Sequence, residues 1–187
     1  MVEAGVHRKY IVGGNWKSNG SVEFVRQMCT ETLNTMAFDE SRVEVVVAPT
    51  SLHITATKAM LNSNVLVAAQ NISAEGNGAF TGEISAEQLV NFGLHWTLIG
   101  HSERRKLYGE TDEIVAQKAA RAQAAGLKVI LCVGETIEQR EAGQTNAVLK
   151  QQMEAVKNSI TNWGNIVIAY EPVWAIGTGK TATPAIA

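Results

Sequence analysis

Ionisable and amide side chains directly follow three short apolar runs of the sequence, and their types suit proton transfer next to a carbonyl group. They are Asn15 and Lys17, then His101, Ser102 and Glu103, and finally Glu171. A carboxylate at the end of an apolar strand suits a general base, and a neutral imidazole donates well to a carbonyl oxygen. An ammonium group would hold the negative charge of the enediolate that forms. The set therefore predicts proton abstraction next to a carbonyl.

The local context of these residues supports the same chemistry. Asn15 and Lys17 are two positions apart, so on an extended segment both point the same way. His101 begins a polar helix start, where backbone N–H groups disfavour a charged imidazolium. Glu171 stands before Pro172, whose ring restricts the backbone. Taken singly, each has a structural reading: a solvated lysine, a helix-start histidine and a strand-end glutamate.

The segment after Glu171, residues 172–183, is typical of a hinged lid. It has a rigid start at Pro172, glycines at its tip and small residues at its end. Gly177 and Gly179 can bring backbone N–H groups close to a phosphate because no side chain intervenes. A nucleotide P-loop is excluded, because its pattern needs glycine where Trp174 stands.

Six apolar runs alternate with helical stretches, which predicts βα units and a parallel sheet. The runs are residues 10–13, 43–48, 65–69, 96–100, 128–133 and 165–170. Two helices begin with capping boxes, Ser85 with Gln88 and Thr136 with Gln139, and Gly126 ends another. Both a doubly wound open sheet and a closed barrel fit this alternation. The first run lacks the G-x-G-x-x-G that an open dinucleotide-binding sheet carries, which favours the barrel.

Composition limits the class of protein. The chain has 187 residues, 45% of them hydrophobic, with a net charge of −2, which predicts a single domain over residues 1–187 and no nucleic-acid or membrane partner. Cys29 and Cys132 match no metal spacing and are too few for a disulfide framework, and Cys132 is interpreted as core packing. The first ten residues lack the apolar stretch of a secretory signal. A cytoplasmic location is expected.

Five motifs, in order, resemble the triosephosphate isomerase family from about residue 8 to about residue 184. They are GGNWK at 13–17, GAFTGE at 78–83, IGHSERR at 99–105, CVGE at 132–135 and the stretch 169–183. Any one of them is unspecific, whereas all five together are very specific. Their joint occurrence outweighs the structural readings of the single residues.

The resemblance implies a (β/α)8 barrel that interconverts glyceraldehyde 3-phosphate and dihydroxyacetone phosphate in glycolysis and gluconeogenesis, without metal or organic cofactor. Glu171 would move the proton, His101 would polarise the carbonyl, and Lys17 would hold the anionic substrate and the enediolate. Asn15 would orient the substrate, and Glu103 would tune Lys17.

Two further residues take roles by the same resemblance. Gly177 would donate to the phosphate, and lid closure would exclude water from the enediolate. Thr81 would reach into a partner subunit, which implies a homodimer.

The sequence departs from the family at two places. Ser18 stands where many members have methionine, a change that is expected to be tolerated. The chain carries about six βα units, without strands seven and eight and the phosphate-binding residues on them. By itself such an opened barrel is expected to be unstable and nearly inactive. An alternative function is therefore an inactive truncated product that binds full-length isomerase, and another phosphate-binding barrel enzyme is disfavoured.

Overall fold

The computed structural model describes residues 8–175 of the chain. It divides into two compact units, Met1–Gln70 and Asn71–Ala187. Each unit contains three parallel strands with their helices. A single domain over residues 1–187 stays a prediction. No helix in the described part of the chain has the length and apolar character needed to cross a lipid bilayer.

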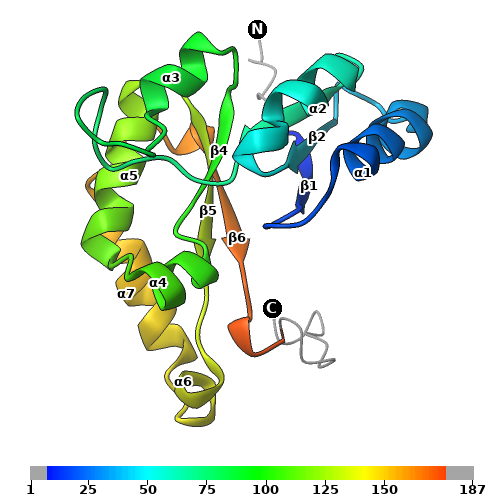
Figure 1. The fold of residues 1–187 in the computed structure, drawn as a ribbon. Coiled ribbons are helices and arrows are strands. Elements are labelled where there is room, and N and C mark those ends of the chain that lie inside the picture. Colours follow the sequence, from blue (N-terminus) through cyan, green and yellow to red (C-terminus); the bar gives the residue numbers. More distant parts are fainter. Residues whose placement is uncertain (1–7, 176–187) are drawn as a thin grey trace, which may run out of the picture. The chain divides into compact units, whose positions relative to one another are not determined.

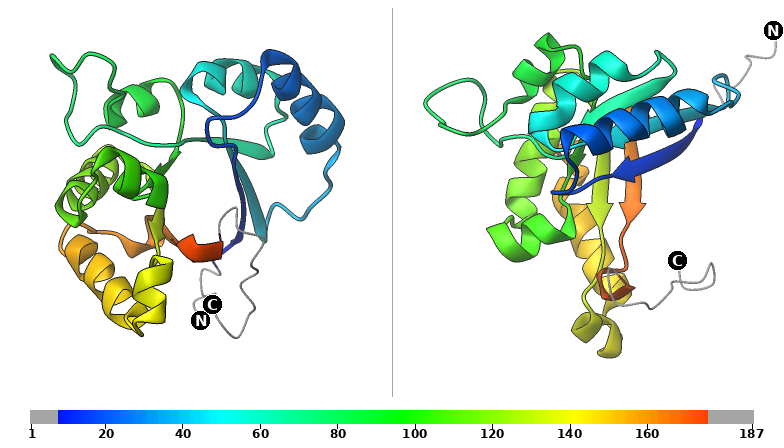
Figure 2. Two further views of the ribbon diagram at one scale, coloured as in Figure 1. Left: turned by 60° about the horizontal axis from the view of Figure 1, so that its bottom comes forward. Right: turned by 45° about the vertical axis from the view of Figure 1, so that its right-hand side comes forward.

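The first unit is a three-stranded parallel sheet with short helices. Its elements are β1 (Tyr10–Asn15), α1 (Val22–Gln27), a π-helical turn (Met28–Thr32), a 3-10 turn (Leu33–Thr35), β2 (Val43–Ala48), a second 3-10 turn (Ser51–His53), α2 (Ile54–Met60) and β3 (Val65–Ala69). Strand β2 lies between β1 and β3. Helix α1 packs against α2, and α2 packs against β3 (Figure 2).

Register in the first unit places Asn15 at the end of the β1 ladder. Tyr10 pairs with Val43, and the pairing continues to Asn15 opposite Ala48. Leu33, Val45, Val47 and Val65 form a buried cluster under this sheet. Because Val45 and Val47 alternate with residues of the other face, the β2 pattern fixes which face the helices cover.

The second unit repeats the arrangement with longer helices. Its elements are α3 (Ala86–Asn91), β4 (Trp96–Ile99), α4 (Ser102–Tyr108), α5 (Asp112–Ala124), β5 (Lys128–Val133), α6 (Ile137–Glu141), α7 (Thr145–Lys157), a 3-10 turn (Trp163–Asn165), β6 (Ile166–Tyr170) and a final 3-10 turn (Val173–Ala175). Strand β5 lies between β4 and β6.

Helices α5 and α7 pack against each other and lie on the same side of the β4–β6 sheet (Figure 1). Val115 and Ala119 of α5, Val129 and Leu131 of β5 and Val156 of α7 are buried. The sheet-facing helix stripe and the continuous apolar strands expected of a covered parallel sheet are therefore both present. This packing fixes the carboxyl ends of β4, β5 and β6, where the chain turns toward α4, α6 and the 172–175 segment.

The local signals predicted from the sequence are confirmed. Ser85 with Gln88 and Thr136 with Gln139 form complete capping boxes at α3 and α6. Helix α5 ends at Ala124, and Gly126 follows it with φ +84°. A left-handed conformation at this position suits glycine, because it has no Cβ to clash.

A buried polar cluster ties α4 to α5. Glu110 lies between them and accepts from Lys118 Nζ and from Arg104 Nε, the latter at 2.5 Å. Lys118 also donates to Asn71 Oδ1 at 2.9 Å. Burial lowers the pKa of Lys118, against the opposing effect of Glu110. These bonds hold the turn between the helices, and with it the start of α4, in one geometry.

Candidate active site

The candidate residues fall into two groups, one in each unit. Asn15 ends β1 in the first unit, and Lys17 follows that strand. His101, Ser102 and Glu103 follow β4 and Glu171 follows β6 in the second. Gly177 lies outside the described residues.

In the first unit, Lys17 is held in an unusual backbone conformation. Its φ is +53°, a left-handed value that costs a non-glycine residue about 1–3 kcal/mol. Two contacts fix it: the Lys17 backbone N–H donates to Asn15 Oδ1 at 2.9 Å, and the Lys17 carbonyl accepts from Gln70 Nε2 at 2.8 Å. Asn15 thus acts here on the Lys17 backbone. The geometry sets the direction in which the lysine side chain leaves the chain.

Gln70 is a residue that the sequence analysis missed. It directly follows β3, and its Nε2 donates to the carbonyls of both Lys17 and Ala48, each at 2.8 Å. It therefore ties the Lys17 turn to the end of β2. The sequence shows only that Gln70 is the polar residue after the apolar run 65–69, and it does not show what the amide binds.

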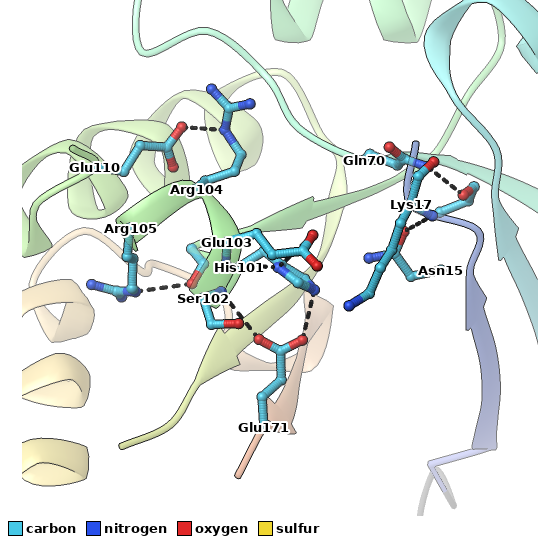
Figure 3. A network of polar contacts seen from close by, with 12 residues as sticks. Asn15, Lys17, Gln70, His101, Ser102, Glu103, Arg104, Arg105, Glu110 and Glu171 are labelled. Carbon is cyan, nitrogen blue, oxygen red and sulfur yellow. Dashed lines mark hydrogen bonds and ion pairs between the residues drawn. The ribbon is translucent and has the colours of Figure 1, made fainter. Parts of the chain in front are cut away.

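In the second unit, His101 and Glu171 lie side by side (Figure 3). His101 Nε2 is 2.8 Å from Glu171 Oε1, and the Ser102 backbone N–H donates to Glu171 Oε2 at 3.2 Å. His101 is 5% exposed. The two strand ends thus bring an imidazole and a carboxylate into direct contact at the helix start of α4.

The hydrogen bonds assign the tautomer of His101. Its Nδ1 accepts the backbone N–H of Glu103 at 3.1 Å, so this nitrogen carries a lone pair. The proton of a neutral ring is then on Nε2, which donates to Glu171. The Glu103 carboxylate lies 3.6 Å from the same Nδ1. His101 is the N-cap of α4, so its ring orientation is fixed by the helix that follows.

The turn before His101 is fixed by Arg105. Gly100 has φ +75°, and an added Cβ would meet Cys132 O and Val115 Cγ1 at 3.1 Å each. Arg105 Nε donates to the Gly100 carbonyl at 2.9 Å, and its Nη1 donates to Asp112 Oδ1 at 2.6 Å. Position 100 requires glycine because its φ is positive and because its surroundings leave no room for a Cβ.

Glu135, which follows β5, is a second residue whose place the sequence analysis missed. It is fully buried and accepts hydrogen bonds from four side chains. The donors are Tyr170 Oη at 3.0 Å, Trp174 Nε1 at 3.1 Å, Arg140 Nη1 at 3.2 Å and Thr145 Oγ1 at 3.3 Å. Burial raises its pKa, but these bonds and its own backbone outweigh burial and keep the pKa below the ordinary value. Glu135 therefore holds the side chains of Tyr170 and Trp174, which precede and follow Glu171 in the chain.

Cys132 is buried in β5, as expected for a packing residue. Burial and the nearby Glu171 carboxylate raise its thiol pKa, so it is a poor nucleophile. Among residues 8–175, no group of three or more His, Cys, Asp or Glu side chains is arranged to hold a metal ion.

The Glu171 carboxylate is stabilised in its charged form. Burial raises its pKa, but the hydrogen bonds donated by His101 and Ser102 outweigh this effect, and the pKa lies below its ordinary value. A glutamate in the unfolded chain has a pKa of about 4.3. Because the folded pKa is the lower one, Glu171 stabilises the fold above about pH 4.3, and this contribution is lost as the pH falls through the folded pKa.

We therefore expect the stability difference between wild type and Glu171→Gln to depend on pH. It should be constant from about pH 7 to about pH 5 and should shrink below about pH 4. Urea titrations of both proteins at each pH measure it. A difference that stays constant down to about pH 3 would contradict the lowered pKa.

Comparisons with known proteins extend over nearly the whole chain. The family model of triosephosphate isomerase matches residues 10–187. A chloroplastic triosephosphate isomerase of Secale cereale is 52% identical over 176 residues, which cover 94% of this chain and 58% of the relative. A cytosolic triosephosphate isomerase of Oryza sativa subsp. japonica is 50% identical over 177 residues, which cover 95% of this chain and 70% of the relative.

The chain thus spans between about half and three-quarters of the length of these relatives. The comparisons do not favour the alternative of an inactive binding product. The residues that match the family model include all five motifs found in the sequence. The chain belongs to the triosephosphate isomerase family.

Proposed function

We propose that the protein carrying this chain interconverts dihydroxyacetone phosphate and glyceraldehyde 3-phosphate by proton transfer through an enediolate, a step of glycolysis and gluconeogenesis. The observation that carries the proposal is the contact of 2.8 Å between His101 Nε2 and Glu171 Oε1, with the His101 proton on Nε2. A carboxylate base and a neutral hydrogen-bond donor are the two groups that enolisation needs.

The reaction begins at the Glu171 carboxylate. It takes a proton from the hydroxyl-bearing carbon next to the carbonyl; the C–H electron pair forms a C=C bond, and the carbonyl electron pair moves onto oxygen. The enediolate oxygen takes the Nε2 proton of His101, and Nε2 takes the proton of the neighbouring hydroxyl, so the negative charge moves to that hydroxyl oxygen. The protonated Glu171 then returns its proton to the former carbonyl carbon while the charged oxygen forms the new C=O bond, which gives the other triose phosphate.

The contact between His101 and Glu171 explains how substrate binding can make Glu171 a stronger base. Before substrate binds, the Nε2–H bond stabilises the Glu171 carboxylate and keeps its pKa low. When the substrate oxygen takes over that Nε2–H, the carboxylate loses a stabilising bond and becomes a stronger base. Substrate binding thus activates the base.

The remaining residues take supporting roles in the proposal. Lys17 stabilises the anionic substrate and the enediolate, Asn15 orients the substrate, and Glu103 tunes Lys17. Gly177 donates its backbone N–H to the phosphate. The support for Lys17 and Asn15 is their common turn, in which Asn15 Oδ1 and Gln70 fix the Lys17 backbone.

The test is a coupled assay in both directions on the protein expressed with any sequence that its gene adds beyond residue 187, in a host whose own isomerase gene is deleted. We expect interconversion of the two triose phosphates, and exchange of deuterium from D₂O into the carbon-bound position. Purified protein that is folded but catalyses neither would overturn the proposal.

We also propose that the protein is a homodimer in which Thr81 contacts the partner. Thr81 is exposed in the 71–85 loop, which is closed by the bond from Ser73 N to Ile84 O at 2.8 Å and from Ser85 Oγ to Asn77 Oδ1 at 2.6 Å. A closed loop loses little entropy when it docks. Light scattering that gives a dimer for wild type and a monomer for Thr81→Arg supports this; a monomeric wild type contradicts it.

A cytosolic location belongs to the same proposal, following the name of the rice relative. The rye relative is named as chloroplastic. Subcellular fractionation of the source organism separates the two locations, and recovery in a plastid fraction would contradict the proposal.

A further inference from the structure

Gln152 of α7 binds both backbone groups of a single residue, Gly134. Gly134 N–H donates to Gln152 Oε1 at 2.9 Å, and Gln152 Nε2 donates to the Gly134 carbonyl at 3.1 Å. Gln152 is 9% exposed. Its amide thus presents one acceptor and one donor to one residue, as a neighbouring strand does in a sheet.

This arrangement begins where the ladder between β5 and β6 ends. Val133 pairs with Tyr170, and the Glu171 N–H donates to the Val133 carbonyl at 2.7 Å. The next residue of the β6 chain is Pro172, which has no N–H to offer. Gly134 therefore finds its donor and acceptor on α7, and Gln152 takes the place of β6.

Gly134 in turn lies directly against the backbone of Glu171. An added Cβ at Gly134 would lie 1.8 Å from the Glu171 carbonyl oxygen and 2.8 Å from its carbonyl carbon. The Gly134 Cα and the Glu171 carbonyl are therefore in contact. A shift of Gly134 toward Glu171 must move the Glu171 backbone, because nothing between them can yield.

The side chain of Glu171 depends on that backbone position. Its two carboxylate oxygens reach separate partners, His101 Nε2 at 2.8 Å and Ser102 N at 3.2 Å. Catalytic groups must be held within about 0.5 Å of their productive geometry. A backbone displaced at Glu171 would lose one or both of these contacts.

We propose that Gln152 is a positioning residue for Glu171, acting through Gly134. This inference rests on the proposed function, in which Glu171 is the base. Gln152 touches no reacting atom. It fixes the Gly134 peptide groups, Gly134 fixes the Glu171 backbone, and that backbone places the carboxylate between His101 and Ser102.

The decisive variant is Gln152→Glu, which keeps the size and the acceptor but replaces the donor by a carboxylate oxygen facing the Gly134 carbonyl. Gln152→Met has a side chain of similar length but makes neither bond to Gly134. It is the test variant to use if Gln152→Glu does not fold. The matched control is Gln151→Met, which adds no charge beside Asp112, the partner of Arg105. Gln151 is the preceding residue of α7 and donates to Asp112 Oδ2 at 2.9 Å, so it loses a similar bond without touching Gly134.

We expect Gln152→Glu to lower kcat by about 10- to 100-fold, because a displacement on the order of 1 Å costs about that much. KM should change less than about threefold, because Gln152 is not assigned a substrate contact. The acid limb of the kcat/KM profile should move to higher pH, since Glu171 loses stabilising bonds. The Gln151→Met control should keep the wild-type kcat and acid limb.

NMR titration of the Glu171 side-chain carboxyl tests the positioning role of Gln152 independently of the proposed function. In Gln152→Glu its pKa should rise toward the ordinary value, whether or not the protein is an isomerase. An inactive wild type with this shift overturns the proposed function and supports the positioning role. Equal kcat, acid limb and Glu171 pKa in the Gln152 and Gln151 variants, with only the melting temperature lowered, would overturn the positioning role.

Discussion

Replacing Glu171 by glutamine is expected to lower kcat of the proposed isomerase reaction by about 10² to 10⁴-fold, the usual contribution of a general base. The amide matches the carboxylate in size, and its oxygen still accepts from His101 Nε2, which lies 2.8 Å from Glu171 Oε1. It cannot take a proton from carbon. Packing at the site is thus retained while the base is removed, and KM should change little.

The measurement is the steady-state rate in both directions, together with deuterium exchange at the carbon-bound position. The matched control is Glu154→Gln on α7, an exposed glutamate whose side chain pairs with Lys157 at 3.4 Å; it should keep the wild-type rate. If Glu171→Gln retained more than about a tenth of wild-type kcat, Glu171 could not be the base.

Strand positions could be predicted because each strand is an apolar run bounded by polar residues. Three of the six predicted runs, 43–48, 65–69 and 128–133, match β2, β3 and β5. Strand β1 continues two residues beyond the predicted 10–13, since the ladder to β2 continues through Asn15. The apolar run ends at its last apolar residue, whereas the backbone hydrogen bonds of the strand continue beyond it. Family membership confirms the (β/α)8 barrel class.

The contact between His101 and Glu171 follows from a rule that sequence can supply, because side chains at the carboxyl ends of parallel strands gather at one edge. Gln70, Glu135 and Gln152 act differently. Each binds the backbone or an aromatic side chain of another segment, and residue type and spacing do not reveal such a partner. Gln152 and Gln151 are adjacent and identical in type, yet only the structure shows that one binds Gly134 and the other Asp112.

Replacing Gly134 by alanine is expected to have the largest effect on stability. The new Cβ would lie 1.8 Å from the Glu171 carbonyl oxygen, whereas overpacking a core by a methyl group at ordinary distances costs about 1–3 kcal/mol. Here the obstacle is backbone rather than a flexible side chain. The hydrogen bond from Glu171 N to Val133 O holds the Glu171 backbone in place, and the two bonds to Gln152 hold Gly134 in place. We expect a loss of about 3 kcal/mol or more.

Urea unfolding of Gly134→Ala measures that loss, and Gly13→Ala is the matched control. At Gly13 an added Cβ would meet nothing nearer than the Val46 carbonyl at 3.9 Å, so the cost should stay below about 1 kcal/mol. The folded fraction of Gly134→Ala should also lose kcat, since relief of the clash moves the Glu171 backbone. Because Gln152 acts through the same contact, adding Gln152→Glu should then lower kcat by much less than it does in wild type. Independent, multiplicative losses would mean that the two residues reach Glu171 by separate routes.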